Sequence, residues 1–123
     1  MYYVMKRFRE REAGAGLHYL CLRAEITEGG SKVFSIYDNN DLKQQVALFN
    51  IEGNFYAISN ICAHEGGPLN QGTLEKTIVT CPWHGWKYDV RNGKSPHLGG
   101  DSVKSFKIKL IGNKLYLDLT KLN

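Results

Sequence analysis

Two short stretches decide how this sequence of 123 residues is interpreted: CAHEGGP at 62–68 and CPWHGWKY at 81–88. Each holds one cysteine and one histidine, Cys62 with His64 and Cys81 with His84. Sixteen residues separate His64 from Cys81. Thiolates and imidazoles bind zinc as well as iron bridged by sulfide. The two stretches therefore predict one metal centre with two sulfur and two nitrogen donors.

Both stretches carry residues that favour loops. Gly66 to Pro68 supply backbone freedom and then a stop in the first loop. In the second, Pro82 biases Cys81 towards an extended backbone, and Gly85 permits a close approach of the chain after His84. Each loop is expected to contribute one sulfur and one nitrogen.

The rest of the chain has the pattern of an all-β protein. Short runs of Val, Ile, Phe, Tyr and Leu alternate with Gly, Asn and Pro, and no helical period is sustained. This pattern predicts antiparallel sheets or a sandwich. The expected strands are 2–8, 17–26, 33–37, 46–51, 54–58, 78–81, 86–90, 103–111 and 115–119, with 60–74 and 81–85 as loops.

Three hairpins are expected. The turns at 52–54 and 112–113 contain glycine between apolar runs, and glycine accepts the positive φ that tight turns need. In the hairpin around 112–113, apolar and polar residues alternate, so each strand should bury one face. The least patterned region, 25–45, is expected to form a hairpin with a mobile tip.

Length and charge limit the remaining possibilities. A chain of 123 residues suits one domain, 1–123. The formal charge of +4 is spread along it without a dense basic patch, which argues against a nucleic-acid partner. No apolar run reaches the length of a signal peptide or of a membrane span, so we expect a soluble, cytoplasmic protein without a membrane anchor.

Three side chains outside the predicted centre receive structural interpretations. Cys21 lies in an apolar stretch and is expected to be a buried small hydrophobe with no chemical role. His18 and His97 are expected to be structural or exposed histidines. With Cys62 and Cys81 binding metal, no intrachain disulfide is possible, which fits a reducing compartment.

The same two stretches resemble the two cluster-binding boxes of Rieske proteins. The resemblance is strong over 60–93, continues as a strand pattern over 46–119, and does not extend specifically to 1–45. It implies the Rieske fold, with a small cluster-binding subdomain at about 60–100, formed by the two loops and inserted in a β base. It also implies one [2Fe-2S] cluster per chain, with the inner iron on Cys62 and Cys81 and the outer iron on His64 and His84.

Departures from the family pattern point to one branch. Rieske subunits of cytochrome bc complexes carry an additional cysteine in each loop, and this chain has none at 65–67 or 82–83. Their serine two residues after the second histidine is Trp86 here, whereas Tyr88 keeps the place of a tyrosine. Fewer hydrogen bonds to the cluster disfavour its reduction, so a low potential is expected. The pattern is similar to ferredoxins that serve aromatic-ring oxygenases.

The resemblance implies a one-electron carrier and not an enzyme. Its partners would be a flavoprotein reductase and a terminal oxygenase or another redox protein. Pro96 would belong to a loop over the cluster, with His97 near the docking surface. Two alternatives stay open: a small subunit of a larger oxidoreductase, similar to that of assimilatory nitrite reductase, and a structural zinc site with the same four ligands.

Overall fold

The computed structural model describes residues 2–4, 16–38, 40–63, 66–83, 85–96 and 100–119, and of 2–4 only the backbone. Within these ranges the chain forms strands and two 3-10 helices of three residues each, which confirms the all-β prediction. The strands are β1 (Tyr2–Val4), β2 (Leu17–Leu22), β3 (Ser31–Tyr37), β4 (Lys43–Ile51), β5 (Asn54–Ser59), β6 (Thr73–Glu75), β7 (Ile78–Thr80), β8 (Lys87–Asp89), β9 (Ser105–Ile111) and β10 (Lys114–Asp118). The helices are η1 (Arg23–Glu25) and η2 (Leu69–Gln71).

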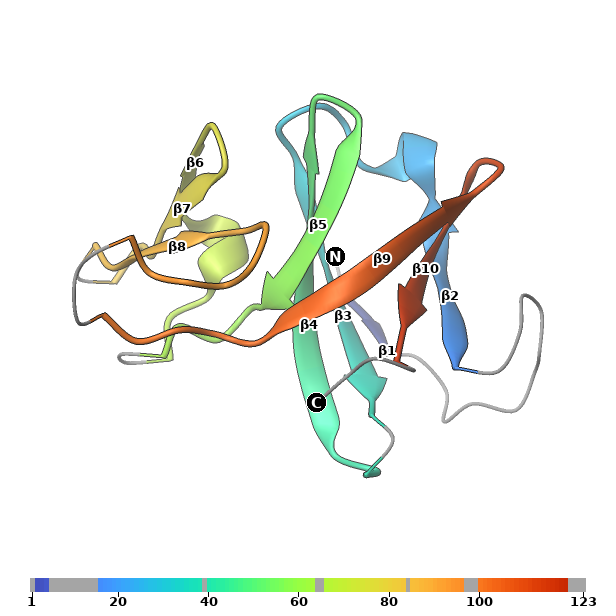
Figure 1. Ribbon diagram of the computed structural model, residues 1–123, viewed down its shortest axis with the longest axis horizontal. Helices are drawn as coiled ribbons and strands as arrows, with labels where there is room; N and C mark the ends of the chain where they lie inside the picture. The colour runs from blue at the N-terminus through green and yellow to red at the C-terminus, as the bar shows by residue number, and fades with distance from the viewer. Residues whose placement is uncertain are drawn as a thin grey trace.

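Seven strands form one large sheet in the order β1-β3-β4-β5-β9-β10-β2 (Figure 1). All its pairings are antiparallel except that of β1 with β3. β2 and β3 lie far apart in this order, yet both contribute to one core. The sheet therefore bends around that core, whose buried residues are Leu20, Cys21, Ile26, Phe34, Ile36, Val46, Leu48, Ala57, Phe106, Leu115, Leu117 and Leu119.

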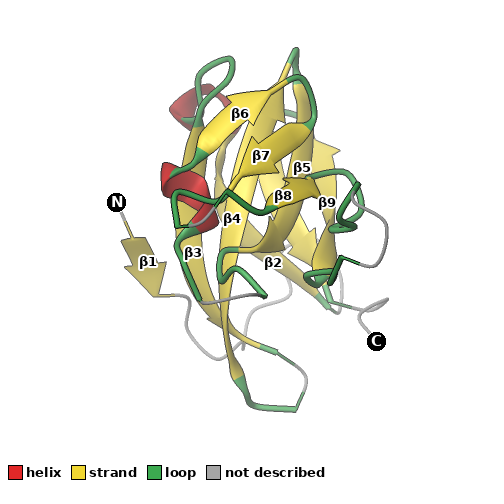
Figure 2. Ribbon diagram, turned by 90° about the vertical axis from the view of Figure 1, so that its left-hand side faces the viewer, coloured by secondary structure: helices red, strands yellow, loops and turns green. Residues whose placement is uncertain are grey.

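A second sheet, β6-β7-β8, covers the outer face of β4 and β5 (Figure 2). Side chains alternate along β4: Val46 and Leu48 enter the first core, while Ala47 and Phe49 enter a second one. Val79 of β7 and Tyr88 of β8 close this second core from the other side. β4 is thus buried on both faces, and the small sheet rests on a rigid base.

The strand predictions are correct in kind, with errors at short elements. β6 begins inside the expected loop 60–74 and ends one residue beyond it, and η1 ends the strand expected over 17–26. β6 escaped prediction because it has three residues and its hairpin turn uses Lys76 at a φ of 57°, which no glycine marks. Of the strand expected at 2–8, the structure describes only 2–4.

The three expected hairpins are present. In the β4–β5 turn both Glu52 and Gly53 have positive φ, whereas Gly112 alone does in the β9–β10 turn. In the hairpin of β3 and β4, the Asp38 carboxylate accepts hydrogen bonds from the backbone N–H groups of Asn40 and Leu42 at 2.9 and 3.0 Å. Side-chain capping of this kind stabilises the turn.

The burial predicted for the last hairpin is wrong in two places. Tyr116 and Asp118, expected to face solvent, are 5% exposed each, so β10 is buried on both faces. Tyr116 packs edge-on against Tyr19 of β2 at 5.8 Å between ring centroids. Leu110 of β9, expected to be buried, is 41% exposed, because β9 pairs with β5 only at Ser105 and Phe106 and no described strand lies on that side further along.

No helix in the part of the chain that the structure describes has the length and apolar character needed to cross a membrane.

Gly93 provides a test of the close packing between the two sheets. It has a φ of 78°, and a Cβ placed there would lie 2.1 Å from the carbonyl oxygen of Val103. Gly29 has a similar φ of 76° but open space around it. Gly29→Ala should cost about 1 kcal/mol from backbone strain alone. Gly93→Ala should cost about 3 kcal/mol or more, because the backbone at Val103 must also move.

Denaturant unfolding followed by circular dichroism measures both substitutions. Equal losses of stability in the two variants would show that the Gly93 contact with Val103 is not a constraint.

Candidate metal centre

The first cysteine loop starts immediately after β5 and is closed by backbone hydrogen bonds. The Cys62 N–H donates to the Gly67 carbonyl at 2.9 Å, and the Gly66 N–H donates to the Cys62 carbonyl at 2.9 Å. An isolated bridge between Ile61 and Pro68 extends this pairing. These bonds close the loop as a small hairpin between Cys62 and Gly67.

The second loop connects β7 and β8 and is closed in the same way. The Cys81 N–H donates to the Trp86 carbonyl at 2.7 Å, again five residues along the chain. Thr80 and Lys87 form the last pair of the β7–β8 ladder below it. His64 lies within the first closed loop and His84 within the second, but both lie outside the described residues.

The two loops meet at Gly67. A Cβ there would lie 2.8 Å from the Cys81 Sγ and 3.0 Å from the Trp83 ring. Only a residue without a side chain permits this approach. Cys62 and Cys81 are each 2% exposed, and none of the chain's three cysteines, all of which the structure describes, is in a disulfide. The fold thus brings one buried thiol from each predicted loop to a common junction.

Each of these sulfurs has a hydrogen-bond partner. The Cys62 Sγ lies 3.3 Å from the Tyr88 hydroxyl, and the backbone N–H of Trp83 donates to the Cys81 Sγ at 3.4 Å. Tyr88 is fully buried, and this burial, followed by its bond to Cys62, raises the pKa of the phenol. The phenol therefore stays protonated at neutral pH and can donate to a thiolate.

Asn60 anchors the first loop, and the sequence analysis missed it. Its side-chain amide donates to the Gln45 Oε1 at 2.7 Å, and its Oδ1 accepts from the Asn70 N–H at 2.7 Å. Its backbone binds the Gln45 carbonyl and the Leu69 N–H, both at 2.8 Å. This buried residue ties β4 and η2 to the start of the loop. The feature of the sequence that could have identified it is an asparagine directly after an apolar strand.

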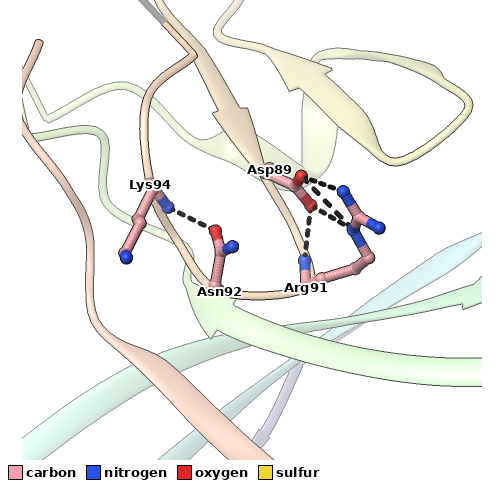
Figure 3. A network of polar contacts seen from close by, with 4 residues as sticks. All are labelled: Asp89, Arg91, Asn92 and Lys94. Carbon is pink, nitrogen blue, oxygen red and sulfur yellow. Dashed lines mark hydrogen bonds and ion pairs between the residues drawn. The ribbon is translucent and has the colours of Figure 1, made fainter.

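The turn after β8 is closed by its own polar side chains (Figure 3). The Asp89 carboxylate accepts from the Arg91 guanidinium at 2.7 Å and from the Arg91 N–H at 2.9 Å, and the Asn92 Oδ1 accepts from the Lys94 N–H at 2.9 Å. The Arg91 hydrogen bond lowers the pKa of Asp89. The sequence analysis gave this turn no role.

Two apolar side chains flank the junction at the surface. Ile61 is 42% exposed and Trp83 is 48% exposed, and they come one from each loop. Gly66 lies beside Ile61, and Gly67 lies beside Trp83. Trp86 is instead half-buried and packs against the second core.

The remaining predicted residues are placed only in part. His18 is buried in β2 opposite Leu117, as expected of a structural histidine. Cys21 is 1% exposed in the first core, as expected. Pro96 is exposed, and His97 lies outside the described residues.

Comparisons with known proteins agree on one family. The model of the Rieske [2Fe-2S] domain matches residues 17–107. The human protein apoptosis-inducing factor 3 is 32% identical over 98 residues, which are 79% of this chain but 14% of that protein. The 3-phenylpropionate/cinnamic acid dioxygenase ferredoxin subunit of Escherichia coli strain K12 is 30% identical over 103 residues, 82% of this chain and 92% of the subunit.

A solved structure shows the same fold. The ferredoxin of carbazole 1,9a-dioxygenase from Nocardioides aromaticivorans IC177 superimposes with a TM-score of 0.70 at 22% identity, covering 82% of this chain and 97% of that ferredoxin. The arrangement of sheets described above is therefore shared despite a low sequence identity.

Cys21 provides a pH-dependent test of its assignment as a core residue. Burial raises its pKa to about 11, with a smaller contribution from Glu25. At pH 8 only about one thiol in a thousand is then ionised, and the thiolate is the reactive form. Alkylation of Cys21 by iodoacetamide, followed by peptide mass mapping, should be far slower in the folded protein than in denaturant. Its rate should rise with pH up to about 11.

Equal rates at pH 8 in folded and unfolded protein would contradict the burial of Cys21.

Proposed function

Because this chain belongs to the Rieske [2Fe-2S] domain family, we propose that it carries single electrons through one [2Fe-2S] cluster held by Cys62, His64, Cys81 and His84. The observation that carries this proposal is the junction of the two loops. Two buried thiols, from loops closed by the same five-residue hydrogen bond, are brought together where Gly67 leaves room for sulfur.

The donor set fits this cluster. Two thiolates on one iron and two imidazoles on the other are the ligands of a Rieske centre. Cys62 and Cys81 lie at the buried base of their loops and would hold the inner iron. His64 and His84 lie further along the same two loops and would hold the outer iron nearer to solvent. The bound cluster supplies reversible one-electron chemistry, being neutral with its thiolates when oxidised and −1 when reduced.

The chain's own groups would set the conditions for that chemistry. The two sulfurs are almost fully removed from water. With both thiolates on iron, the Tyr88 hydroxyl would donate to the Cys62 Sγ, and the backbone N–H of Trp83 donates to the Cys81 Sγ. Such donors favour the reduced state. The serine hydroxyl of higher-potential relatives is replaced by Trp86. Because that hydroxyl is absent, we expect a reduction potential in the lower part of the range of Rieske centres, which is roughly −150 to +300 mV.

The partners we propose are a flavoprotein reductase and a terminal oxygenase. A relative that this chain matches over most of its length is named as the ferredoxin subunit of a dioxygenase. Ile61 and Trp83 offer exposed apolar surface on both sides of the junction, where a partner must approach for electron transfer. The chain would then transfer electrons without making or breaking substrate bonds itself.

One observation supports a second arrangement. The chain spans 14% of apoptosis-inducing factor 3, so a similar domain occurs within a much larger protein. A permanent subunit or domain of a larger oxidoreductase would use the same cluster and differ only in its fixed partner.

The cluster is tested by iron and sulfide analysis together with electron paramagnetic resonance of the reduced protein. We expect two irons and two sulfides per chain. Cys62→Ala and Cys81→Ala should lose both, because each removes an iron ligand. Cys21→Ala is the matched control and should keep them, since Cys21 lies in the other core. Zinc in place of iron, or iron retained in Cys62→Ala, would overturn the assignment.

The carrier function is tested by stopped-flow spectroscopy with separately purified proteins. A flavoprotein reductase of a dioxygenase system should reduce the cluster, and the matching oxygenase should reoxidise it, each in a bimolecular step whose rate rises with partner concentration. Size-exclusion chromatography of the native protein provides the contrast. If the protein elutes only as part of a larger complex of fixed composition, the subunit arrangement is favoured over the mobile carrier.

A further inference from the structure

Lys87 occupies a distinctive position beside the second loop. It is the first residue of β8, paired with Thr80 in the last ladder step before Cys81. Its side chain is half-buried, and its Nζ donates to the Thr80 Oγ1 at 3.0 Å. This bond holds the ammonium group beside Thr80, on the face of the small sheet opposite to Val79 and Tyr88. The position of the charge is therefore fixed by the fold instead of being averaged over solvent.

Among the residues that the structure describes, no neighbouring acid neutralises the charge of Lys87. Within the described ranges it makes no ion pair with a carboxylate. Other basic residues do: Lys32 pairs with Glu25 at 2.8 Å, and Arg91 pairs with Asp89 at 2.7 Å. Asp89 is two residues from Lys87 on the same face of β8, but its carboxylate is held by Arg91. Lys87 therefore presents a full positive charge to its surroundings.

The ammonium group is close enough to the centre to act on it. It lies no more than about 12 Å from the Cys81 Sγ, because only the Thr80 side chain and one peptide unit separate the bonded hydroxyl from that sulfur. This distance is comparable to the screening length of about 8–10 Å at physiological salt. Since the side chain is half-buried and fixed, part of its field reaches the cluster.

We infer that Lys87 is an electrostatic positioning residue that raises the reduction potential of the cluster. This inference rests on the proposed function. Reduction adds one negative charge at the loop junction, and a fixed cation nearby stabilises that state relative to the neutral one. The charge of Lys87 thus partly compensates for the absence of a serine hydroxyl at position 86. Both groups favour reduction, the serine through a hydrogen bond and Lys87 through its charge.

The experiment is a redox titration of the holoprotein, followed by visible absorption and electron paramagnetic resonance. Lys87→Gln should lower the equilibrium constant for reduction of the cluster by about three- to tenfold. For a one-electron couple this is a fall in midpoint potential of about 30 to 60 mV. The fall should shrink as salt is raised, because screening shortens the reach of the charge. Lys87→Arg keeps the charge and should retain the wild-type midpoint.

Two further variants separate charge from packing. Lys76→Gln removes an equal charge from the exposed turn at the far end of the same sheet, and should leave the midpoint unchanged. Thr80→Val removes the hydroxyl that holds the ammonium group while keeping the charge. It should lower the midpoint by less than Lys87→Gln does.

The outcomes distinguish this inference from the proposed function. If the wild-type protein contains no iron, the proposed function is wrong, and the inference about Lys87 is wrong with it. A wild-type protein that holds the cluster, with Lys87→Gln no different from Lys76→Gln, would overturn only the role of Lys87. Equal falls in Lys87→Gln and Lys87→Arg would assign the effect to packing and overturn the electrostatic role as well.

Discussion

The contact between the two cysteine loops at Gly67 is the constraint on which the rest of the site depends. Each loop is closed on itself by a hydrogen bond from the cysteine N–H to a carbonyl five residues later. The loops come together only because Gly67 has no side chain where the Cys81 sulfur lies. A methyl group there would fall within 2.8 Å of that sulfur and would push the loops apart. The donor set proposed above requires this approach.

The large sheet holds the loops in this arrangement. β4 is packed on both faces, with one row of side chains in each core, so it has little freedom to shift. Asn60 transfers that rigidity to the first loop through its bonds to Gln45 and Asn70. The second loop stands on the β7–β8 ladder, which rests on the same face of β4 and β5 (Figure 2). A rigid support of this kind limits rearrangement when an electron is gained or lost.

The surroundings of the sulfurs combine low exposure to water with a few directed polar groups. The buried Tyr88 hydroxyl and the backbone N–H of Trp83 lie within hydrogen-bond distance of the two sulfurs, and Lys87 supplies a fixed charge nearby. Each favours added negative charge at the junction by a different physical route. Exposed apolar groups lie beside the same junction, which keeps the distance to a docked partner short.

The sequence by itself determined the fold class, most of the strands and the two cysteine loops, because alternating apolar residues and the spacing of Cys, His, Gly and Pro are local signals. It also indicated the family, through the residues around Cys62 and Cys81. It did not indicate the short strand β6, the burial of Tyr116 and Asp118, or the exposure of Leu110, since these depend on which strands become neighbours. Only the tertiary structure brought Gly67 to Cys81, Asn60 to Gln45 and Lys87 to Thr80. Those contacts join segments whose separation in the chain carries no local pattern, so packing alone could decide them.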